Sequence, residues 1–316
     1  MHIVVTGANG FIGSHLTKAL LERAERDPAA WPLQRLTAVD LSLNQLPDHS
    51  LLRRIEGSFA DDAALQRALT PPADLVFHLA SVPSGRSETD PALGMAVNVQ
   101  GTLRLLDMLK AQGNAPTVVF ASSIAVYGKP QAPLVTDDTP PLPTLSYGAH
   151  KVIGEILVND HVRRGWIKGC SLRLPGIVTR PPEPNGAVSI FLSDLIRELS
   201  QGRPFTCPTS RDAHTWLMSI GCCVENLLHA ARQTFGERRT FLIPPLHVHL
   251  GSLVQAIGEQ FQIPTIDRLI AWQPDPWVEF NFGSYPPVQL PLAEAQGFQA
   301  DRDLRSLVAD SLASGY

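Results

Sequence analysis

The sequence predicts an α/β protein with a doubly wound parallel sheet, followed by a smaller carboxy-terminal lobe. Three observations lead to this fold class. Short runs rich in β-branched residues alternate with longer amphipathic stretches over about the first 175 residues, as in a parallel sheet with crossover helices. Glycines directly follow the first run, as in the tight turn that joins a strand to a helix. Beyond that region the alternation weakens.

The predicted strands are apolar runs too short for helices, and we expect them to be buried on both faces of the sheet. They are HIVVT (2–6), RLTAVDL (35–41), ADLVFHLA (73–80), PTVVFASS (116–123) and CSLRLPG (170–176). Helices are predicted between them, at 13–26, 61–69, 92–112 and 147–164.

The carboxy-terminal lobe is predicted from a loop signal and a helix signal that follow residue 176. RPPEPNG (180–186) has the proline and glycine content of a loop, and SIFLSDLIRELSQG (189–202) is typical of an amphipathic helix ended by glycine. We therefore expect a Rossmann-type domain over 1–175 and a substrate-binding lobe over 176–316, with segments of the lobe returning to the first domain.

The composition indicates a globular chain whose partners are small molecules. Of its 316 residues 44% are hydrophobic and 18% charged, and the net charge is −4, so no basic field for nucleic acid or anionic lipid is expected. No apolar run reaches the ~18–20 residues of a membrane-spanning helix. Because the first predicted strand begins at Ile3, there is no room for a signal peptide, and we expect a cytoplasmic protein.

Neither a disulfide framework nor a metal site is predicted. The four cysteines form no C-x-x-C pair, which favours buried thiols in a reducing compartment. His214 and the HVH run at 247–249 have no third ligand at a suitable spacing.

A dinucleotide site is predicted at TGANGFIG, whose glycines fall at 7, 10 and 13. Gly7 suits a tight turn, Gly10 close approach of a pyrophosphate, and Gly13 close packing of helix on sheet. Amides at the helix N-terminus then face the phosphates. Asp40 ends the second strand, where a carboxylate accepts hydrogen bonds from the adenosine ribose and repels a 2′-phosphate. This role for Asp40 favours NAD over NADP. The alternative is that Asp40 is only an exposed residue at the end of a strand.

Proton-transfer chemistry is predicted from LSYGAHK, where Tyr147 and Lys151 lie four residues apart on one helix face. Ser123 ends a buried strand at the carboxyl edge of the sheet, where ligands bind in open α/β folds. A phenol has an ordinary pKa of about 10, but a nearby ammonium and an oxidised nicotinamide favour the phenolate. We therefore expect Tyr147 to remove a hydroxyl proton, Lys151 to lower the tyrosine pKa and hold the nicotinamide ribose, and Ser123 to hydrogen-bond the reacting oxygen.

Together these motifs resemble the extended short-chain dehydrogenase/reductase family, that is, the NAD-dependent epimerases and dehydratases. The resemblance runs through the glycine turn, FHLAS (77–81), VNVQGT (97–102), SSIAVYG (122–128) and YGAHK (147–151). It implies that Ser123 is the catalytic serine, because it stands four residues before the tyrosine of VYG, and that Asn98 positions the cofactor side of the site. Taken alone, Asn98 is equally typical of a structural amide.

The NAD contacts expected from these motifs are Gly7, Asn9, Gly10, Phe11, Ile12, Gly13, Asp40, Ser58, Phe59, Leu79, Ala80, Asn98, Ser122, Tyr147 and Lys151.

Two departures argue against the nucleotide-sugar branch of that family. RLPG ends in Gly176 where those enzymes carry an asparagine, and TWLMSI (215–220) lacks the arginine that holds their diphosphate. Over nearly the whole chain, FHLASVPSG, SYGAHKVIGEILVNDHVRRG and LRLPGIVTRPPEPNGA instead resemble D-erythronate dehydrogenases. This implies NAD-dependent oxidation of the 2-hydroxyl of a four-carbon sugar acid to the 2-keto acid. Ser58, in place of an aspartate facing adenine, and Gly176, in place of a threonine, depart from that pattern.

The substrate side of the site is the least determined by sequence. Arg180 and Ser84 lie in segments predicted as loops bordering the site, and we expect substrate contacts from Ser84, Ser123, Tyr147 and Arg180. A surface ion pair or a packing stem is the alternative for Arg180. A nucleotide-sugar epimerase or dehydratase and a threonine dehydrogenase-like enzyme remain alternative activities. The resemblance also implies a homodimer through helices 92–112 and 147–164.

Overall fold

The computed structural model describes residues 1–129, 132–182 and 188–313. The chain divides into two compact units, each assembled from three separate segments. The first unit comprises Met1–Ser123, Leu145–Arg173 and Leu227–Phe241, and the second comprises Ile124–Thr144, Leu174–Asn226 and Leu242–Tyr316. The chain therefore passes between the units five times.

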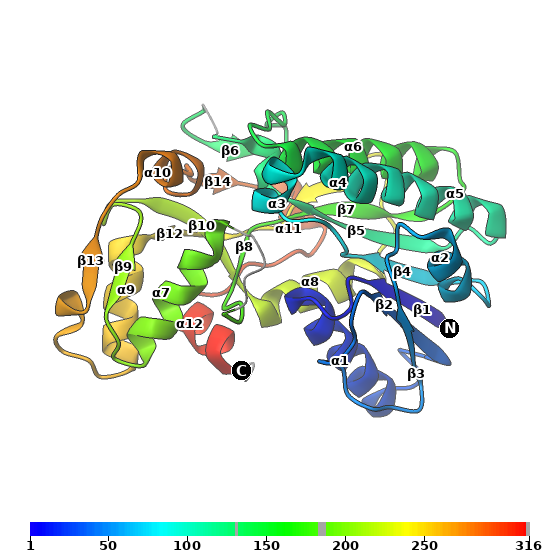
Figure 1. Cartoon of the computed structure of the whole chain (residues 1–316), viewed down its shortest axis with the longest axis horizontal. Coiled ribbons are helices and arrows are strands. Elements are labelled where there is room, and N and C mark those ends of the chain that lie inside the picture. The colour runs from blue at the N-terminus through cyan, green and yellow to red at the C-terminus, as the bar shows by residue number, and fades with distance from the viewer. Residues whose placement is uncertain (130–131, 183–187, 314–316) are drawn as a thin grey trace. The chain divides into compact units, whose positions relative to one another are not determined.

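A seven-stranded sheet forms the centre of the first unit (Figure 1). Its strand order is β11-β7-β5-β4-β1-β2-β3, and the pairs from β3 through β5 are parallel. Every residue of β1 and β4 is buried, which confirms the prediction of a parallel sheet covered on both faces. The strands are β1 (His2–Thr6), β2 (Arg35–Asp40), β3 (Leu52–Glu56), β4 (Leu75–His78), β5 (Thr117–Ser123), β7 (Lys168–Leu174) and β11 (Thr240–Leu242).

All five predicted strands are present, and the sequence missed two at the sheet edges. In β3 only Ile55 is buried, so it carries no continuous apolar run that would mark a parallel strand. The strand β11 has only three residues, which is too short for a periodicity to be recognised.

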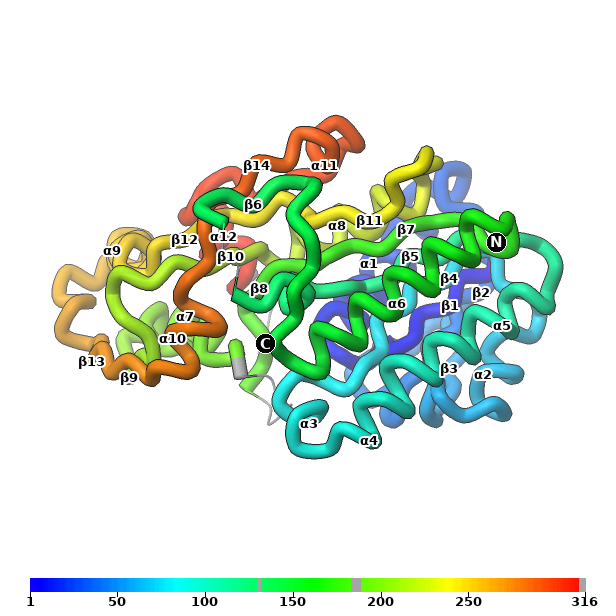
Figure 2. The backbone as a smooth tube through the Cα atoms, turned by 90° about the horizontal axis from the view of Figure 1, so that it is seen from above, coloured from blue at the N-terminus to red at the C-terminus, as the bar shows by residue number. Residues whose placement is uncertain are grey.

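Helices cover both faces of this sheet. One core packs residues of α2, α5 and α6 against β1, β4 and β5, whereas α1 lies on the opposite face (Figure 1). The helices α5 and α6 run side by side (Figure 2). The helical elements are α1 (Phe11–Arg26), α2 (Asp62–Ala68), α3 (Ser84–Thr89), α4 (Pro91–Gly94), η1 (Met95–Gly101), α5 (Thr102–Gln112) and α6 (Ser146–Arg163).

The stretch predicted as one helix at 92–112 is helical throughout, but its middle is not an α-helix. The segment η1 is a π-helix between α4 and α5. Apolar periodicity does not distinguish a π segment from the α-helices that flank it. Such segments are rare and are frequent at functional sites, and this one carries Asn98.

The second unit is built from three small sheets and a separate core. The sheet β12-β10-β8 is accompanied by the pairs β13-β9 and β14-β6. Buried residues of α7, α9 and α12 form the core with β10, and the apolar face predicted at 189–202 is the buried face of α7. Of the RPPEPNG segment, residues 183–186 lie outside the described part of the chain.

The strands of the second unit are β6 (Val135–Thr136), β8 (Gly176–Val178), β9 (Phe205–Cys207), β10 (His214–Ser219), β12 (Leu246–His249), β13 (Ile270–Trp272) and β14 (Val288–Gln289). Its helical elements are η2 (Ile124–Tyr127), η3 (Val188–Ile190), α7 (Phe191–Ser200), α9 (Leu250–Gln260), η4 (Ile266–Arg268), α10 (Pro276–Phe282), α11 (Pro291–Ala295) and α12 (Leu304–Ala313). The helix α8 (Ile220–Ala230) carries the chain from the second unit into the first.

Candidate active site

The glycine turn lies where the strand order of the sheet reverses, between β1 and β4. Gly7 has φ +71°, and a Cβ there would lie 2.7 Å from the amide nitrogen of Ala80, just beyond β4. A Cβ on Gly13 would lie 2.0 Å from the carbonyl oxygen of Gly7. The turn thus packs against the backbone on both sides, and only glycine fits at these two positions. Ligands of open α/β sheets bind at this reversal point.

The N-terminus of α1 is suited to an anion. Its N-cap residue is Gly10, which makes no side-chain hydrogen bond to the first turn, so the amides of that turn can face a phosphate. Phe11 and Ile12 open the helix and are half-buried. These residues were predicted to bind the cofactor, and the structure gathers them in one turn.

Asp40 lies at the end of β2, beside the glycine turn. Its carboxylate accepts hydrogen bonds from the amides of Asn9 (2.9 Å) and Leu41 (2.7 Å). Burial raises the pKa of Asp40, and these amide hydrogen bonds oppose the rise. The Asn9 side chain in turn accepts from the amide of Gln45 at 2.9 Å and donates to Asn44 at 3.0 Å. The side chain of Asn9 therefore stabilises the loop after Asp40 through Asn44 and Gln45.

The segment predicted to meet adenine follows β3 and is tied to Asp40 by the hydrogen bond from the Gly57 amide to the Asp40 carbonyl (2.8 Å). The Ser58 hydroxyl accepts the Ala60 amide at 3.1 Å within a local turn. Phe59 is buried, and its ring meets the His78 ring edge to face at 4.9 Å. The ring of Phe59 thus belongs to the core of the first unit, which leaves its backbone for any adenine contact.

His78, which the sequence did not single out, ties β1, β4 and α5 together below the site. Its two ring nitrogens face the hydroxyls of Thr6 (2.7 Å) and Thr102 (2.9 Å). Burial lowers the pKa of His78 to about 3, and Lys151 adds to this by charge repulsion. The ring is therefore neutral at neutral pH, and it supports Leu79 and Ala80, which follow it in the chain.

Asn98 fixes the loop that continues from β4. Its side-chain oxygen accepts the Val82 amide at 2.7 Å, and its side-chain nitrogen donates to the Val82 carbonyl at 3.0 Å. Both bonds are buried. Asn98 therefore acts on the backbone after Leu79 and Ala80, which fits a residue that positions the cofactor side of the site and also the structural alternative.

Tyr147 and Lys151 lie in the first two turns of α6, at the carboxyl end of β5. The Lys151 ammonium donates to the carbonyl of Ala121 at 2.7 Å and lies 5.4 Å from the centre of the Tyr147 ring. Lys151 is buried, and Tyr147 is half-buried. Ser123 is the half-buried last residue of β5, two residues after Ala121. The structure thus brings the ammonium and the phenol to the strand end that carries Ser123.

Ser122 faces the other way. Its hydroxyl donates to Glu155 at 2.5 Å, in a buried hydrogen bond. Glu155 also accepts two hydrogen bonds from Arg173 on β7, at 2.9 and 2.8 Å. Ser122 was predicted to contact the cofactor; because its hydroxyl is directed into the protein, such a contact would have to come from its backbone. Glu155 was not predicted from the sequence, although it continues the spacing of Tyr147 and Lys151 by four more residues.

Ser84 and Arg180, the two predicted substrate contacts that are not also predicted catalytic residues, lie in different units. Ser84 is the first residue of the short helix α3 in the first unit, so its prediction as a loop residue is wrong: Pro83 before it has the extended conformation of an N-cap.

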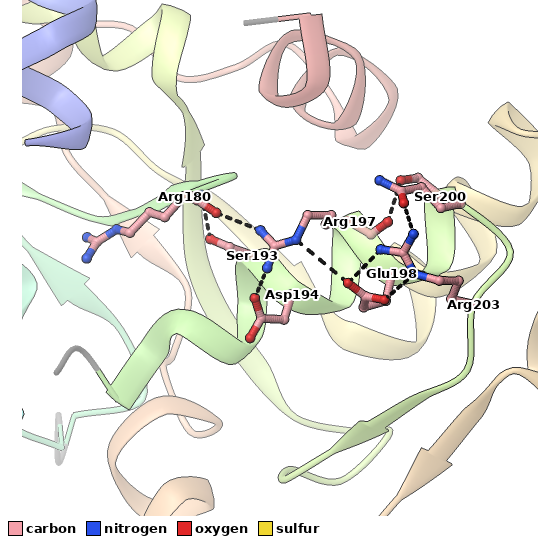
Figure 3. A network of polar contacts seen from close by, with 8 residues as sticks. Arg180, Ser193, Asp194, Arg197, Glu198, Ser200 and Arg203 are labelled. Atoms are coloured by element: carbon pink, nitrogen blue, oxygen red, sulfur yellow. Dashed lines mark hydrogen bonds and ion pairs between the residues drawn. The ribbon is translucent and has the colours of Figure 1, made fainter. Parts of the chain in front are cut away.

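Arg180 lies in the second unit, where α7 holds its backbone at both polar groups (Figure 3). Its amide donates to the Ser193 hydroxyl at 3.0 Å, and its carbonyl accepts from Arg197 at 2.7 Å. Its guanidinium points away from Arg197 (Figure 3).

The described residues contain no group of three or more histidine, cysteine or acidic side chains that could hold a metal ion. In the same part of the chain, no helix is long and apolar enough to cross a membrane.

Comparison with known proteins agrees with this geometry. Residues 3–243 match the model of the NAD dependent epimerase/dehydratase family. The chain belongs to this family. The family is NAD-dependent, so NAD is the cofactor, and the protein is an oxidoreductase.

The chain is also similar to individual proteins over nearly its whole length. The chain is 36% identical over 314 residues to D-erythronate dehydrogenase from Cupriavidus necator, covering 98% of this chain and 97% of that protein. It is 30% identical to D-erythronate dehydrogenase from Haemophilus influenzae, with 98% of each chain covered. A solved structure described as the nucleoside-diphosphate-sugar epimerase from Agrobacterium tumefaciens superposes with a TM-score of 0.90 at 29% identity, covering 100% of this chain and 95% of that one.

Proposed function

We propose that the protein oxidises the 2-hydroxyl of a small polyhydroxy acid, of which D-erythronate is the first candidate, to the corresponding 2-keto acid. The observation that carries the proposal is the placement of Lys151 beside Tyr147 at the end of β5, in a chain whose full length is similar to D-erythronate dehydrogenases. The first unit would bind NAD, and the second unit would contribute to binding the acid.

In this proposal Tyr147 accepts the proton of the 2-hydroxyl as the hydride leaves the same carbon. NAD supplies the hydride acceptor when bound. The ammonium of Lys151 favours the phenolate by charge, and its hydrogen bond to Ala121 fixes its position. Ser123 donates to the substrate oxygen, on which negative charge develops as its proton is lost. The products are the 2-keto acid, reduced cofactor and one proton.

The direct test is to incubate the protein with NAD and D-erythronate, L-threonine or a uridine-diphosphate sugar in parallel. We expect reduced nicotinamide to accumulate with D-erythronate, and the variant Tyr147→Phe to lower kcat by about 10²–10⁴-fold. The second candidate, a nucleotide-sugar epimerase, is favoured by the superposition with the Agrobacterium tumefaciens structure. Epimerisation of the nucleotide sugar without net reduction, and no turnover of any acid, would replace the first proposal by the second.

Arg180 is the proposed partner of the substrate carboxylate. Because Ser193 and Arg197 hold its backbone, the direction of its side chain is set from α7. Arg197 is itself held by an ion pair with Asp194 (Figure 3). We expect Arg180→Ala to raise KM for the acid while leaving the Kd for NAD unchanged, and Arg197→Ala to do so less strongly.

The matched control for Arg180 is Arg203→Ala, which removes a guanidinium of the same network that pairs with Glu198 at 2.6 Å and not with Arg180. Its KM should stay at the wild-type value. If Arg180→Ala and Arg203→Ala behave alike, Arg180 has no role in holding the substrate.

A homodimer through the α4–η1–α5 stretch and α6 is proposed as the assembly. These side-by-side helices (Figure 2) expose Met95 (41%), Leu103 (40%) and Ile156 (62%), and exposed large apolar side chains are the kind that an interface covers. We also propose a cytoplasmic location, which the four free cysteines support. Cell fractionation would test it.

A further inference from the structure

We propose that Glu155 is a positioning residue, which Arg173 holds in place and which fixes the register of α6 against the end of β5. This inference rests on the proposed roles of Ser123, Tyr147 and Lys151, since it concerns how their two elements are kept aligned.

The spacing on α6 provides the first argument. Tyr147, Lys151 and Glu155 follow one another at intervals of four residues, so they lie along one face of the helix. Lys151 binds the carbonyl of Ala121 at 2.7 Å, and Glu155 binds the hydroxyl of Ser122 at 2.5 Å. Two successive turns of the helix are therefore bound to two successive residues of the strand. The next residue of the strand is Ser123, and the preceding turn of the helix carries Tyr147.

The second argument is how firmly Glu155 is held. Arg173 donates from Nε and Nη2 to the two oxygens of Glu155, at 2.9 and 2.8 Å, in the two-pronged geometry that fixes both planes. Glu155 is 4% exposed and Arg173 is 9% exposed. Arg173 lies on β7, the neighbour of β5 in the sheet. Arg173 thus holds the carboxylate of Glu155 at a fixed place on the sheet, and a shift of α6 along the sheet would break these hydrogen bonds.

The third argument is the close approach of helix and strand at this point. A Cβ on Gly154 would lie 2.5 Å from the ring of Phe120, so α6 lies against β5 closely enough for Glu155 to reach Ser122. A buried ion pair often stabilises a fold no better than apolar side chains of similar size. The pair is therefore better explained by the alignment that it enforces, since a displacement of about 1 Å among catalytic groups can lower a rate by about 10²-fold.

The test separates alignment from stability. In the double variant Glu155→Met/Arg173→Met, apolar side chains replace the whole ion pair, and stability is expected to stay near that of the wild type, whereas Ser122 loses its acceptor. We expect kcat to fall by about 10–100-fold, with the Kd for NAD changed less than threefold. Ser122→Ala, which leaves Glu155 and Arg173 paired, should lower kcat in the same direction but less.

A second measurement makes the test independent of the substrate. Amide hydrogen exchange at residues 146–151 should be faster in the double variant than in the wild type, at matched stability against urea. A double variant as stable as the wild type, with unchanged kcat and unchanged exchange, would overturn the inference. If Tyr147→Phe loses activity while the double variant keeps full activity, the inference is overturned and the proposed function is retained. If no acid is turned over at all, the proposed function fails and the exchange measurement decides the inference.

Discussion

Replacing Gly13 by alanine is the sharpest test of the dinucleotide turn. The new Cβ would lie 2.0 Å from the Gly7 carbonyl oxygen and 2.8 Å from the Ala8 Cα. Since Cβ contacts under 3.0 Å essentially never occur, the turn and α1 must separate by about 1 Å. Both contacts are with backbone, which cannot rotate aside as a flexible side chain would.

The expected cost follows from that displacement. Overpacking of this kind destabilises a fold by about 1–3 kcal/mol, and about 1 Å of movement between the turn and the amides of α1 should weaken NAD binding by at least about tenfold, given that similar misplacements cost about 10²-fold in catalysis. The measurements are urea unfolding and a titration with NAD.

Gly221 offers a matched control. It lies in α8, and a Cβ there would meet nothing within 4 Å, so Gly221→Ala should be neutral or stabilising by up to about 1 kcal/mol. If Gly13→Ala bound NAD as tightly as Gly221→Ala, close packing of α1 on the turn would not be what the glycine provides.

Three further predictions concern charge and assembly. Because burial raises the pKa of Asp40, NAD affinity should fall as the pH falls through that raised pKa, and Asp40→Asn should bind weakly at all these pH values in NAD titrations; a wild type that binds equally well throughout would contradict it. Folding lowers the pKa of His78 from 6.5 to about 3, so the unfolded chain binds a proton first as the pH falls, and this residue should remove about 2 kcal/mol of stability between pH 7 and pH 5. Urea unfolding at the two pH values should show this dependence reduced in His78→Gln, and an unchanged dependence would refute it. Ile156→Arg should convert the proposed dimer to a monomer, as measured by light scattering. Leu292→Arg, at an exposed position of the second unit, should leave the dimer intact. If both variants are dimers, α6 does not form the interface.

Much of the first unit was predictable because each signal is local in sequence. Burial can be predicted from the apolar runs at 2–6 and 116–123, and the structure has strands there. The turn geometry can be predicted from the three glycines within a few residues. Lys151 and Tyr147 were singled out by their four-residue spacing together with the serines that end the strand predicted at 116–123.

The contacts that sequence reasoning missed join distant residues. Glu155 and Arg173 are 18 residues apart and meet only once α6 has packed on the sheet, and His78 joins threonines 72 and 24 residues away. Ser122 could not be assigned a direction from the sequence, because both serines at the end of β5 are equally suited to face a ligand. The four-residue continuation from Lys151 to Glu155 was the one signal that could have revealed the buried carboxylate.

The interleaving of the two units limits how this enzyme can be re-engineered. A chain cut after residue 175 would keep the glycine turn, Ser123, Tyr147 and Lys151 but would lose the segment Leu227–Phe241 of the first unit. A foreign second unit therefore cannot be attached as a single module, because it would have to supply two inserts and a carboxy-terminal segment with matching ends. New substrate preferences on this scaffold are more readily sought by exchanging single side chains, such as the proposed carboxylate partner Arg180, than by exchanging domains.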